Sequence, residues 1–239
     1  MRKNVVLSVL LFIALQLGYS NLYATLFSTQ DTFARDKTSG SPDPIFGTYN
    51  YLMFGTDNYT YDHVVLFQFD LSAESAGAVK DAYIQLYCFT TTGLDLSLVT
   101  LVKINESWDE NTVTWNNQPQ TDSISLLYNV KKSTDLVNWE ITSLIDTSNV
   151  FYRFYLNSKG NDLISSWLDG SLLNYGLMFK IDSGNDTANF APKEYTGIYT
   201  NRKAQLGYTY DTSIPEPLSL ILLIMSGISL CIKSFFKQR

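Results

Sequence analysis

Short runs of alternating apolar and polar residues recur along the middle of this chain, and turn-forming residues separate them. Residues 82–90 alternate most clearly, with Ile84, Leu86 and Cys88 on one side of an extended chain. Successive side chains of a strand point to opposite faces, so the pattern predicts half-buried β-strands. Nothing indicates a long amphipathic helix. The chain is therefore expected to be all-β, with antiparallel sheets packed as a β-sandwich or jelly roll.

The same alternation predicts most of the remaining secondary structure. Aromatic residues make up 14% of the chain, with 16 Tyr and 14 Phe, and this composition suits strands better than helices. Short helical turns are expected at Leu144-Ile145 and over residues 163–168. Further strands are predicted over residues 31–34, 64–70, 96–104, 137–141, 152–156, 175–181 and 204–210.

The first 24 residues differ in character from this middle region. Arg2 and Lys3 give a basic start, an apolar core follows, and Ala24 offers a small residue at a plausible cleavage point. These are the features of a secretory signal peptide. An uncleaved membrane anchor is the alternative, although the apolar core is shorter than the ~20 residues that a bilayer span requires.

Residues 213–239 form an equally distinct C-terminal tail. Pro215, Glu216 and Pro217 precede a hydrophobic run that is expected to be helical, and basic residues end the chain. The tail resembles the PEP-CTERM sorting signal of bacterial surface proteins. That resemblance implies recognition by an exosortase-type membrane protease, transient anchoring through the helix, and a secreted, cell-surface location. A permanent anchor is the alternative, and the trailing cations favour a cytoplasmic C-terminus.

Residues 25–212 remain as one domain, which is long enough for a single sizeable core. Five of the 17 Lys and Arg residues and one of the 23 Asp and Glu residues lie in the two ends, so the domain carries 12 cations against 22 acids, a net charge of −10. Nucleic acid and other polyanions are poor partners for such a surface. A neutral or cationic partner fits better unless cations are concentrated locally. Cys88 has no cysteine partner within the domain, so its core must be stable without a disulfide.

The segment 106–119 is the most specific string in the domain. It places Trp108 and Trp115 seven residues apart around residues 112–115, whose alternation predicts a strand. Turn-forming residues on both sides are expected to end this strand. Val113 and Trp115 then share one face, which indicates a core position for Trp115.

Four other regions carry a pattern beside this string: an opening region (31–35, 46–47 and 52–55), residues 66–72, residues 82–87, and a closing region (167–171, 174–177, 193–194 and 202–206). Together the five regions resemble the DNRLRE domain, also described as the family 96 carbohydrate-binding module. Gln68 stands where that family usually has Arg. The resemblance implies a β-jelly roll that binds an extracellular polysaccharide without catalysis, and some members are described as binding acidic polysaccharides such as alginate. A structural or adhesive matrix protein with no discrete sugar site is the alternative.

Aromatic faces that stack on sugar rings, together with amides and carboxylates, are the groups that a sugar site needs. The tyrosines of the polar loops before residue 64 are candidates, although tyrosines also rim cores with their hydroxyls in water. Lys193, Arg202 and Lys203 of the closing region could recognise a carboxylate-bearing sugar, but in a domain of net charge −10 they are too few to favour a polyanion. The candidate carbohydrate-binding residues are Tyr49, Tyr51, Tyr59, Tyr61, Trp108, Lys193 and Arg202.

Catalysis has little support in the sequence. His63 is the one histidine, expected at the surface or at a strand edge, and no nucleophile elbow, zinc-ligand cluster or phosphate-binding loop is present. No pattern marks a glycosidase pair among the acids. Asp182 and Asp186 lie in a polar turn whose oxygens could hold Ca²⁺, but the spacing does not fit an EF-hand loop, so a solvated turn is the preferred interpretation; no other cofactor is expected. Trp139 and Trp167 are expected to pack rather than to bind.

Overall fold

The computed structural model describes residues 23–36, 44–56, 62–134, 138–181, 186–195 and 202–211. One compact unit extends from Leu22 to Tyr210. The predicted tail and the predicted signal peptide lie outside the described residues, except that Tyr23 and Ala24 belong to the first strand. None of the helices within the described ranges has the length and hydrophobicity of a membrane span.

Strands dominate the described region, as the alternation predicted. Every strand pairing is antiparallel, with eleven strands in one large sheet and two, β5 and β9, in a small one. The described region is therefore mostly β and antiparallel, as predicted, with one short helix in addition. The elements are β1 (Tyr23–Arg35), β2 (Leu52–Thr56), β3 (Asp62–Phe69), β4 (Val79–Thr91), β5 (Leu94–Asp95), the 3-10 turn η1 (Leu96–Leu98), β6 (Val99–Lys103), β7 (Leu127–Ser133), β8 (Trp139–Thr142), β9 (Leu144–Ile145), β10 (Val150–Leu156), α2 (Ser158–Leu168), β11 (Leu177–Ile181), β12 (Thr187–Phe190) and β13 (Gln205–Tyr210).

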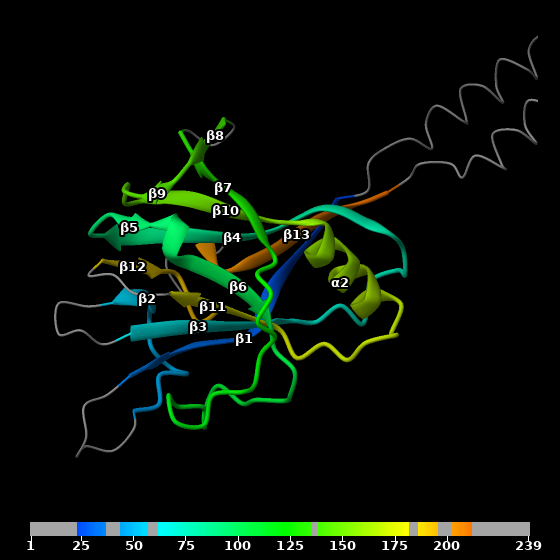
Figure 1. Ribbon diagram of the computed structural model, residues 1–239, viewed down its shortest axis with the longest axis horizontal. Helices are drawn as coiled ribbons and strands as arrows, with labels where there is room; N and C mark the ends of the chain where they lie inside the picture. The colour runs from blue at the N-terminus through cyan, green and yellow to red at the C-terminus, as the bar shows by residue number, and fades with distance from the viewer. Residues whose placement is uncertain are drawn as a thin grey trace, which may run out of the picture. The chain divides into compact units, whose positions relative to one another are not determined.

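The large sheet has two wings (Figure 1). The β3 wing contains β1, β3, β11 and β6, and the β4 wing contains β13, β4, β10, β7 and β8. The first half of β1 pairs with β13 and its second half pairs with β3, so β1 joins the wings. Strand β12 joins them again, because it pairs with both β2 and β4. These pairings close six strands into a ring and leave fewer free sheet edges.

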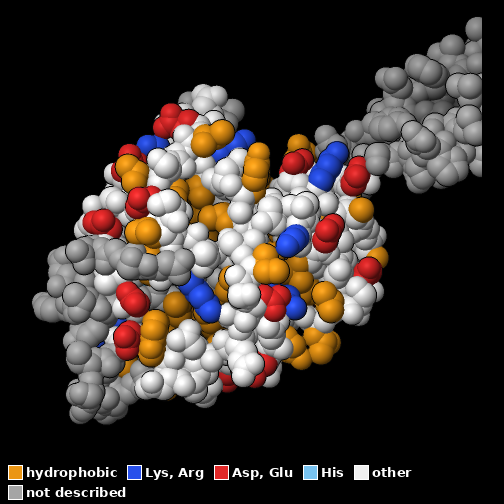
Figure 2. All heavy atoms as spheres, viewed as in Figure 1, with side chains coloured by type: hydrophobic (Ala, Val, Ile, Leu, Met, Phe, Trp, Pro, Cys, Tyr) orange, Lys and Arg blue, Asp and Glu red, His pale blue; other side chains and the backbone are white. Residues whose placement is uncertain are grey.

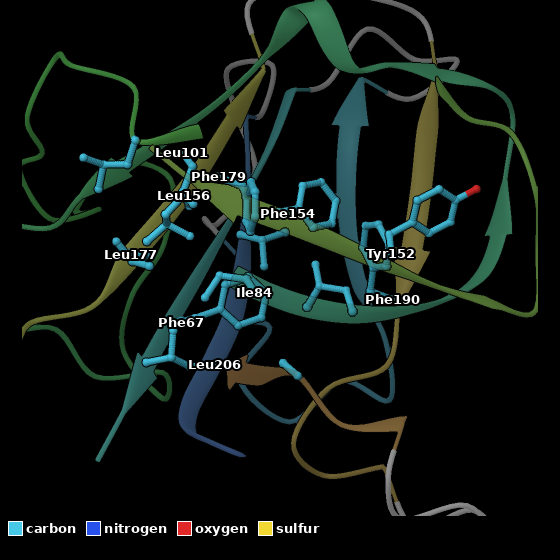
Figure 3. Packing of buried hydrophobic residues seen from close by; sticks show 14 of the residues in the cluster. Phe67, Ile84, Leu101, Tyr152, Phe154, Leu156, Leu177, Phe179, Phe190 and Leu206 are labelled. Atoms are coloured by element: carbon cyan, nitrogen blue, oxygen red, sulfur yellow. The ribbon is translucent and has the colours of Figure 1, made fainter. Parts of the chain in front are cut away.

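Inward side chains of both wings form one large hydrophobic cluster (Figure 3). The Phe179 ring of β11 lies 4.8 Å from the Phe154 ring of β10 and 5.9 Å from the Phe67 ring of β3, measured between ring centroids. All three side chains are less than 2% exposed. Full burial of a side chain of this size stabilises a fold by roughly 1.5–3 kcal/mol. Cys88 is buried in the same cluster as a free thiol, and burial raises its pKa to about 12.

A second, smaller cluster lies on the outer face of the β3 wing, under the loop of residues 105–126. The loop is the long green coil on the β1–β3 side of the domain in Figure 1. Val113 of this loop is 3% exposed, and Trp108 and Trp115 pack partly buried against the same cluster. Residues 106–119 therefore cover a sheet face that would otherwise expose apolar side chains to water.

The strand predicted over residues 112–115 is wrong, because the segment folds on itself in turns. The backbone N–H of Val113 donates to the Asp109 carbonyl at 2.9 Å, and the Asn111 N–H donates to the Asp109 carboxylate at 2.8 Å. Asn117 also bonds to the backbone of the segment. Polar side chains that satisfy the backbone locally remove its need for a neighbouring strand.

The other predicted strands are present with shifted bounds, and the structure adds strands that the alternation did not reveal. The range 96–104 begins with η1, and β7 and β12 had not been predicted. Leu144-Ile145 forms β9 rather than a helical turn, because it pairs with β5. The turn expected over residues 163–168 is the second half of α2. This helix begins after Asn157, whose side chain accepts the N–H of Gly160 at 3.1 Å.

Candidate functional site

The outer face of the β4 wing differs from the covered outer face of the β3 wing. No hydrophobic cluster within the described ranges lies on it. Phe27 of β1 is 47% exposed at one border, and Ile141 of β8 is 72% exposed at the other. The outward side chains of β4, β10 and β7 lie between these borders.

The strand register places these outward side chains in three transverse rows, which together we call the open face. Neighbouring strands lie ~4.8 Å apart, so a row that crosses four strands spans ~14 Å. The middle row is Gln205, Gln85, Arg153 and Lys131; one flanking row is Tyr87, Phe151 and Trp139, and the other is Gly207, Tyr83, Tyr155 and Asn129.

Arg153 is held in the middle row by the residues around it. Its guanidinium carbon lies 3.9 Å from the Trp139 ring centroid and 4.4 Å from the Tyr83 ring centroid. Its Nε donates to Gln85 Oε1 at 2.8 Å, and Gln85 Nε2 donates to Gln205 Oε1 at 3.1 Å. The terminal Nη atoms make no hydrogen bond or ion pair within the described part of the chain. Arg153 is thus preorganised, with its strongest donors available to a ligand.

Lys131 lies directly across from Arg153 in the antiparallel pair of β10 and β7. Like charges in directly opposed positions are destabilising. Lys131 contacts the Tyr155 ring at 4.8 Å, and none of the described carboxylates pairs with it. The next residue, Lys132, points the other way and pairs with Asp146 at 3.0 Å. The open face therefore concentrates two cations that have no counter-ion among the described residues.

Tyr83 lies close to the sheet because the opposite residue on β13 is Gly207. A Cβ atom at that position would lie 2.3 Å from Cζ of the Tyr83 ring, well inside van der Waals contact. A side chain at position 207 would displace the Tyr83 ring, so glycine allows the ring to approach the backbone here. The Tyr83 ring also lies 5.4 Å from that of Tyr155, its neighbour in the row.

Two depressions lie next to the open face. One of about 510 Å³ includes Tyr155, Lys131 and Asp81 in its lining. Another of about 490 Å³ is lined by residues that include Phe89 and Tyr195, and the Phe89 ring lies 5.4 Å from that of Tyr87. The aromatic surface therefore continues from the open face into hollows large enough to hold parts of a ligand.

The tyrosine candidates from the sequence do not all lie in one place. Tyr51 lines the 490 Å³ depression, and Tyr49 is 41% exposed, with its ring 4.9 Å from that of Phe46. Tyr59 and Tyr61 lie outside the described residues.

The two basic candidates occupy different places. Arg202 lies at the edge of the open face, with its guanidinium carbon 4.0 Å from the Tyr87 ring centroid. Lys193 pairs with Glu110 at 2.8 Å and also with Glu194. Lys193 therefore links the 105–126 loop to the segment after β12.

Asp31 of β1 lies beside this link and is 1% exposed. Its Oδ2 accepts the Ser28 hydroxyl at 2.6 Å and the backbone N–H of Lys193 at 2.8 Å. Burial of the carboxyl raises its pKa from 3.8 to about 7, and the nearby Glu194 charge adds to the effect, while these hydrogen bonds and the Lys193 charge oppose it.

The remaining aromatic and histidine predictions have mixed outcomes. Trp108 is half-buried and its Nε1 donates to the Tyr175 carbonyl at 2.8 Å, which gives it a packing role. Trp167 is 6% exposed in the main cluster, as expected. Trp139 belongs to the open face instead. The surface position predicted for His63 is wrong: it is fully buried in β3 because strands pair on both sides, and its Nδ1 lies 3.1 Å from the Gly55 carbonyl oxygen.

The calcium prediction stays untested. Asp182 lies outside the described residues, and the backbone carbonyl of Asp186 accepts the N–H of Thr56 at 3.0 Å. Within the described ranges, no three His, Cys, Asp or Glu side chains are grouped as a metal site requires.

Sequence reasoning missed most of the open face. The alternation of apolar and polar residues predicted β4 and β10 correctly. The outward residues Tyr83, Arg153 and Lys131, however, were not recognised as neighbours. The available signal was that the polar side of two predicted strands carries aromatic and basic residues rather than the short polar residues of a plain solvent face. The net charge of the domain could not locate Lys131 and Arg153 either. Acidic and basic side chains are interspersed on the side of the domain drawn in Figure 2, so one sign of charge does not mark a single region there.

An antiparallel β domain whose open sheet face presents aromatic rings around fixed hydrogen-bond donors is the arrangement of a sugar-binding module. Residues 22–165 match Carbohydrate-binding module family 96. Because this segment is more than half of the chain, the protein belongs to that family, whose domains are typically non-catalytic. The matched segment contains Tyr83, Lys131 and Arg153. No curated protein matches the sequence.

Proposed function

We propose that the protein binds an extracellular polysaccharide bearing carboxylate or sulfate groups, and that the chain lies across the open face. The observation that carries this proposal is the opposed pair of Lys131 and Arg153, which no carboxylate of the described ranges pairs with, in a domain of net charge −10. An anionic group between them would relieve their repulsion and accept the free guanidinium N–H groups. The expectation of a neutral partner applies to the average surface and not to this local concentration of cations.

The aromatic rows supply the second part of the interaction. Tyr83 and Tyr155 on one side, and Phe151 and Trp139 on the other, offer apolar surface to the faces of sugar rings. Since the middle row spans ~14 Å, it is longer than one sugar ring and suits several consecutive units. We infer that the wings are the two layers of a jelly roll, with the open face as one outer surface.

Affinity electrophoresis of the full-length chain in gels containing a polyuronate, a sulfated galactan or a neutral glucan tests the proposal. Wild type is expected to be retarded by at least one anionic polymer, and less so at higher salt. The double variant Lys131→Ala and Arg153→Ala should bind at least ~10-fold more weakly, since hydrogen bonds to charged groups contribute ~1.5–3 kcal/mol each. Lys132→Ala, whose side chain faces the other way, serves as the matched control.

Two results would overturn this function. Retardation of the double variant equal to that of wild type would remove the open face as the site. Failure of wild type to bind any anionic polymer, even at low salt, would favour the rival function of a structural or adhesive protein without a sugar site.

We also propose secretion and surface sorting, supported by the sequence of the two ends. The motif Pro215, Glu216 and Pro217 suits an exosortase-type protease, and residues 1–24 suit a signal peptidase. Mass spectrometry of the protein from its host surface is expected to find neither end intact. A mature chain that retains residues 213–239 would instead indicate a permanent anchor.

A further inference from the structure

A cavity of about 660 Å³ lies away from the open face, between the chain after β3 and the end of α2. It shares no described lining residue with the open face or with the two depressions beside it. Its lining comes from β1, from the chain that leaves β3, from the C-terminal end of α2 and from residue 174. Any ligand bound there would therefore be independent of the middle row of the open face.

The wall of this cavity contains a fixed network of side-chain amides. Gln30 Nε2 donates to Gln68 Oε1 at 2.9 Å, and Gln68 Nε2 donates to the Asn174 carbonyl at 2.9 Å. Asn174 Nδ2 in turn donates to the Phe69 carbonyl at 2.8 Å. The carbonyl oxygen of the Gln30 amide accepts no hydrogen bond from the described residues. Because hydrogen bonds already fix these side chains, their remaining donors and acceptors can bind a ligand with little further loss of side-chain entropy.

The charged groups of the cavity are all acidic. Asp70, Glu74 and Asp169 line it, and no Lys or Arg occurs among its described lining residues. Hydrogen bonds from the hydroxyl and backbone N–H of Ser72 lower the pKa of Asp70, and those of Ser171 do the same for Asp169. Asp70 and Asp169 are therefore ionised at neutral pH, so they accept hydrogen bonds from hydroxyl groups and repel other anions.

An apolar wall completes the cavity. Trp167 and Leu168 of α2 and Leu71 of the chain after β3 are its apolar lining residues. Trp167 is 6% exposed, and its indole N–H has no hydrogen-bond acceptor among the described residues. Amides and carboxylates together with apolar side chains match the hydroxyl-rich edges and apolar faces of a sugar ring.

We propose that this cavity is a second carbohydrate site, specific for an uncharged sugar unit. The two sites then have opposite charge preferences, since the open face offers cations and this cavity offers carboxylates. A protein with both sites would connect an acidic polysaccharide to a neutral one, or bind a polymer in which both kinds of unit occur. Linkage of two sites raises the avidity for such a material above either affinity.

The test is titration of the full-length chain with a panel of neutral oligosaccharides, namely xylo-, manno-, cello- and galacto-oligosaccharides, followed by isothermal titration calorimetry. Wild type should bind at least one of them. The double variant Asp70→Ala and Asp169→Ala should bind it at least ~10-fold more weakly, because it removes both carboxylate acceptors of sugar hydroxyls. Gln30→Ala should weaken binding without altering either carboxylate. Asp162→Ala, an exposed acid of α2 outside the cavity lining, is the matched control.

The same titrations with Lys131→Ala and Arg153→Ala separate this site from the open face. Neutral-sugar binding should be unchanged in that variant, while binding to anionic polymers is lost. The second site is overturned if no neutral oligosaccharide of the panel binds wild type, or if Asp70→Ala, Asp169→Ala and Gln30→Ala all bind it as wild type does. Loss of neutral-sugar binding with Arg153→Ala alone would assign that sugar to the open face instead.

Discussion

Replacing Asp31 by Asn is expected to remove a large part of the pH dependence of the domain's stability. The carboxyl is 1% exposed, and Asn keeps an oxygen that accepts the Ser28 hydroxyl and the Lys193 N–H. The pKa of Asp31 in the folded protein is about 7, above its ordinary value of 3.8, chiefly because burial disfavours the charged form. The folded state therefore binds this proton more tightly than the unfolded state does.

The sign and size of the effect follow from proton linkage. Below pH 3.8 both states hold the proton, and the contribution of Asp31 to stability is fully present; it is lost as pH rises towards 7. At ~1.36 kcal/mol per pH unit, this range corresponds to a loss on the order of 4 kcal/mol from the free energy of unfolding. The variant has no such loss, so it should become more stable than wild type by about this amount between pH 4 and pH 8.

Urea unfolding of the full chain, followed by tryptophan fluorescence at several pH values from 4 to 8, measures this difference. Every other titratable group is present in both proteins, so its contribution cancels when their free energies of unfolding are compared. Asp162→Asn, an exposed acid on α2, controls for the loss of a negative charge and should track wild type. A difference between Asp31→Asn and wild type that stays constant over the whole range would refute the reasoning, because Asp31 would then ionise alike in both states.

Three further outcomes are expected. Trp108→Phe leaves the Tyr175 carbonyl without its 2.8 Å donor and should lower the free energy of unfolding, measured in urea, by ~1–3 kcal/mol. A decrease below ~0.5 kcal/mol would show that this hydrogen bond does not hold the loop in place. Gly207→Ala displaces the Tyr83 ring and should weaken polysaccharide retention with little change in circular dichroism; unaltered retention would show that the ring position does not matter. The Cys88 thiol, buried and with its pKa raised to about 12, should react with a thiol reagent only after denaturation, and rapid labelling of the native chain would contradict its burial.

The strand predictions succeeded where one face of the strand is buried in the core. In β4 and β10 the inward residues at every second position are apolar because they pack in the core, and this period of two is a local property of the sequence. Residues 112–115 show the same local period but form turns. There the side chains of Asp109 and Asn117 satisfy the backbone, and the loop has a sheet face to cover.

The candidate site was harder to predict than the fold. Tyr51 and Arg202 do lie beside the open face, but Lys193 is engaged with Glu110, and Trp108 serves the loop. Each of these residues was selected by its type or by its place in a motif. Neither property reports whether a partner of opposite charge lies nearby, and that partner decides whether a cation is free for a ligand.

The sequence by itself determined the class of this protein: antiparallel strands with defined inner and outer faces, a net acidic domain, and the motifs of a carbohydrate-binding family. The tertiary structure alone decided which outer face the 105–126 loop covers and which stays open. It also decided that Arg153 meets Gln85, a residue 68 positions earlier, and lies opposite Lys131. The physical reason is that alternation fixes only the side of the sheet to which a residue points. The neighbours across the strands depend on the register and order in which distant segments pair, and local sequence does not encode that order.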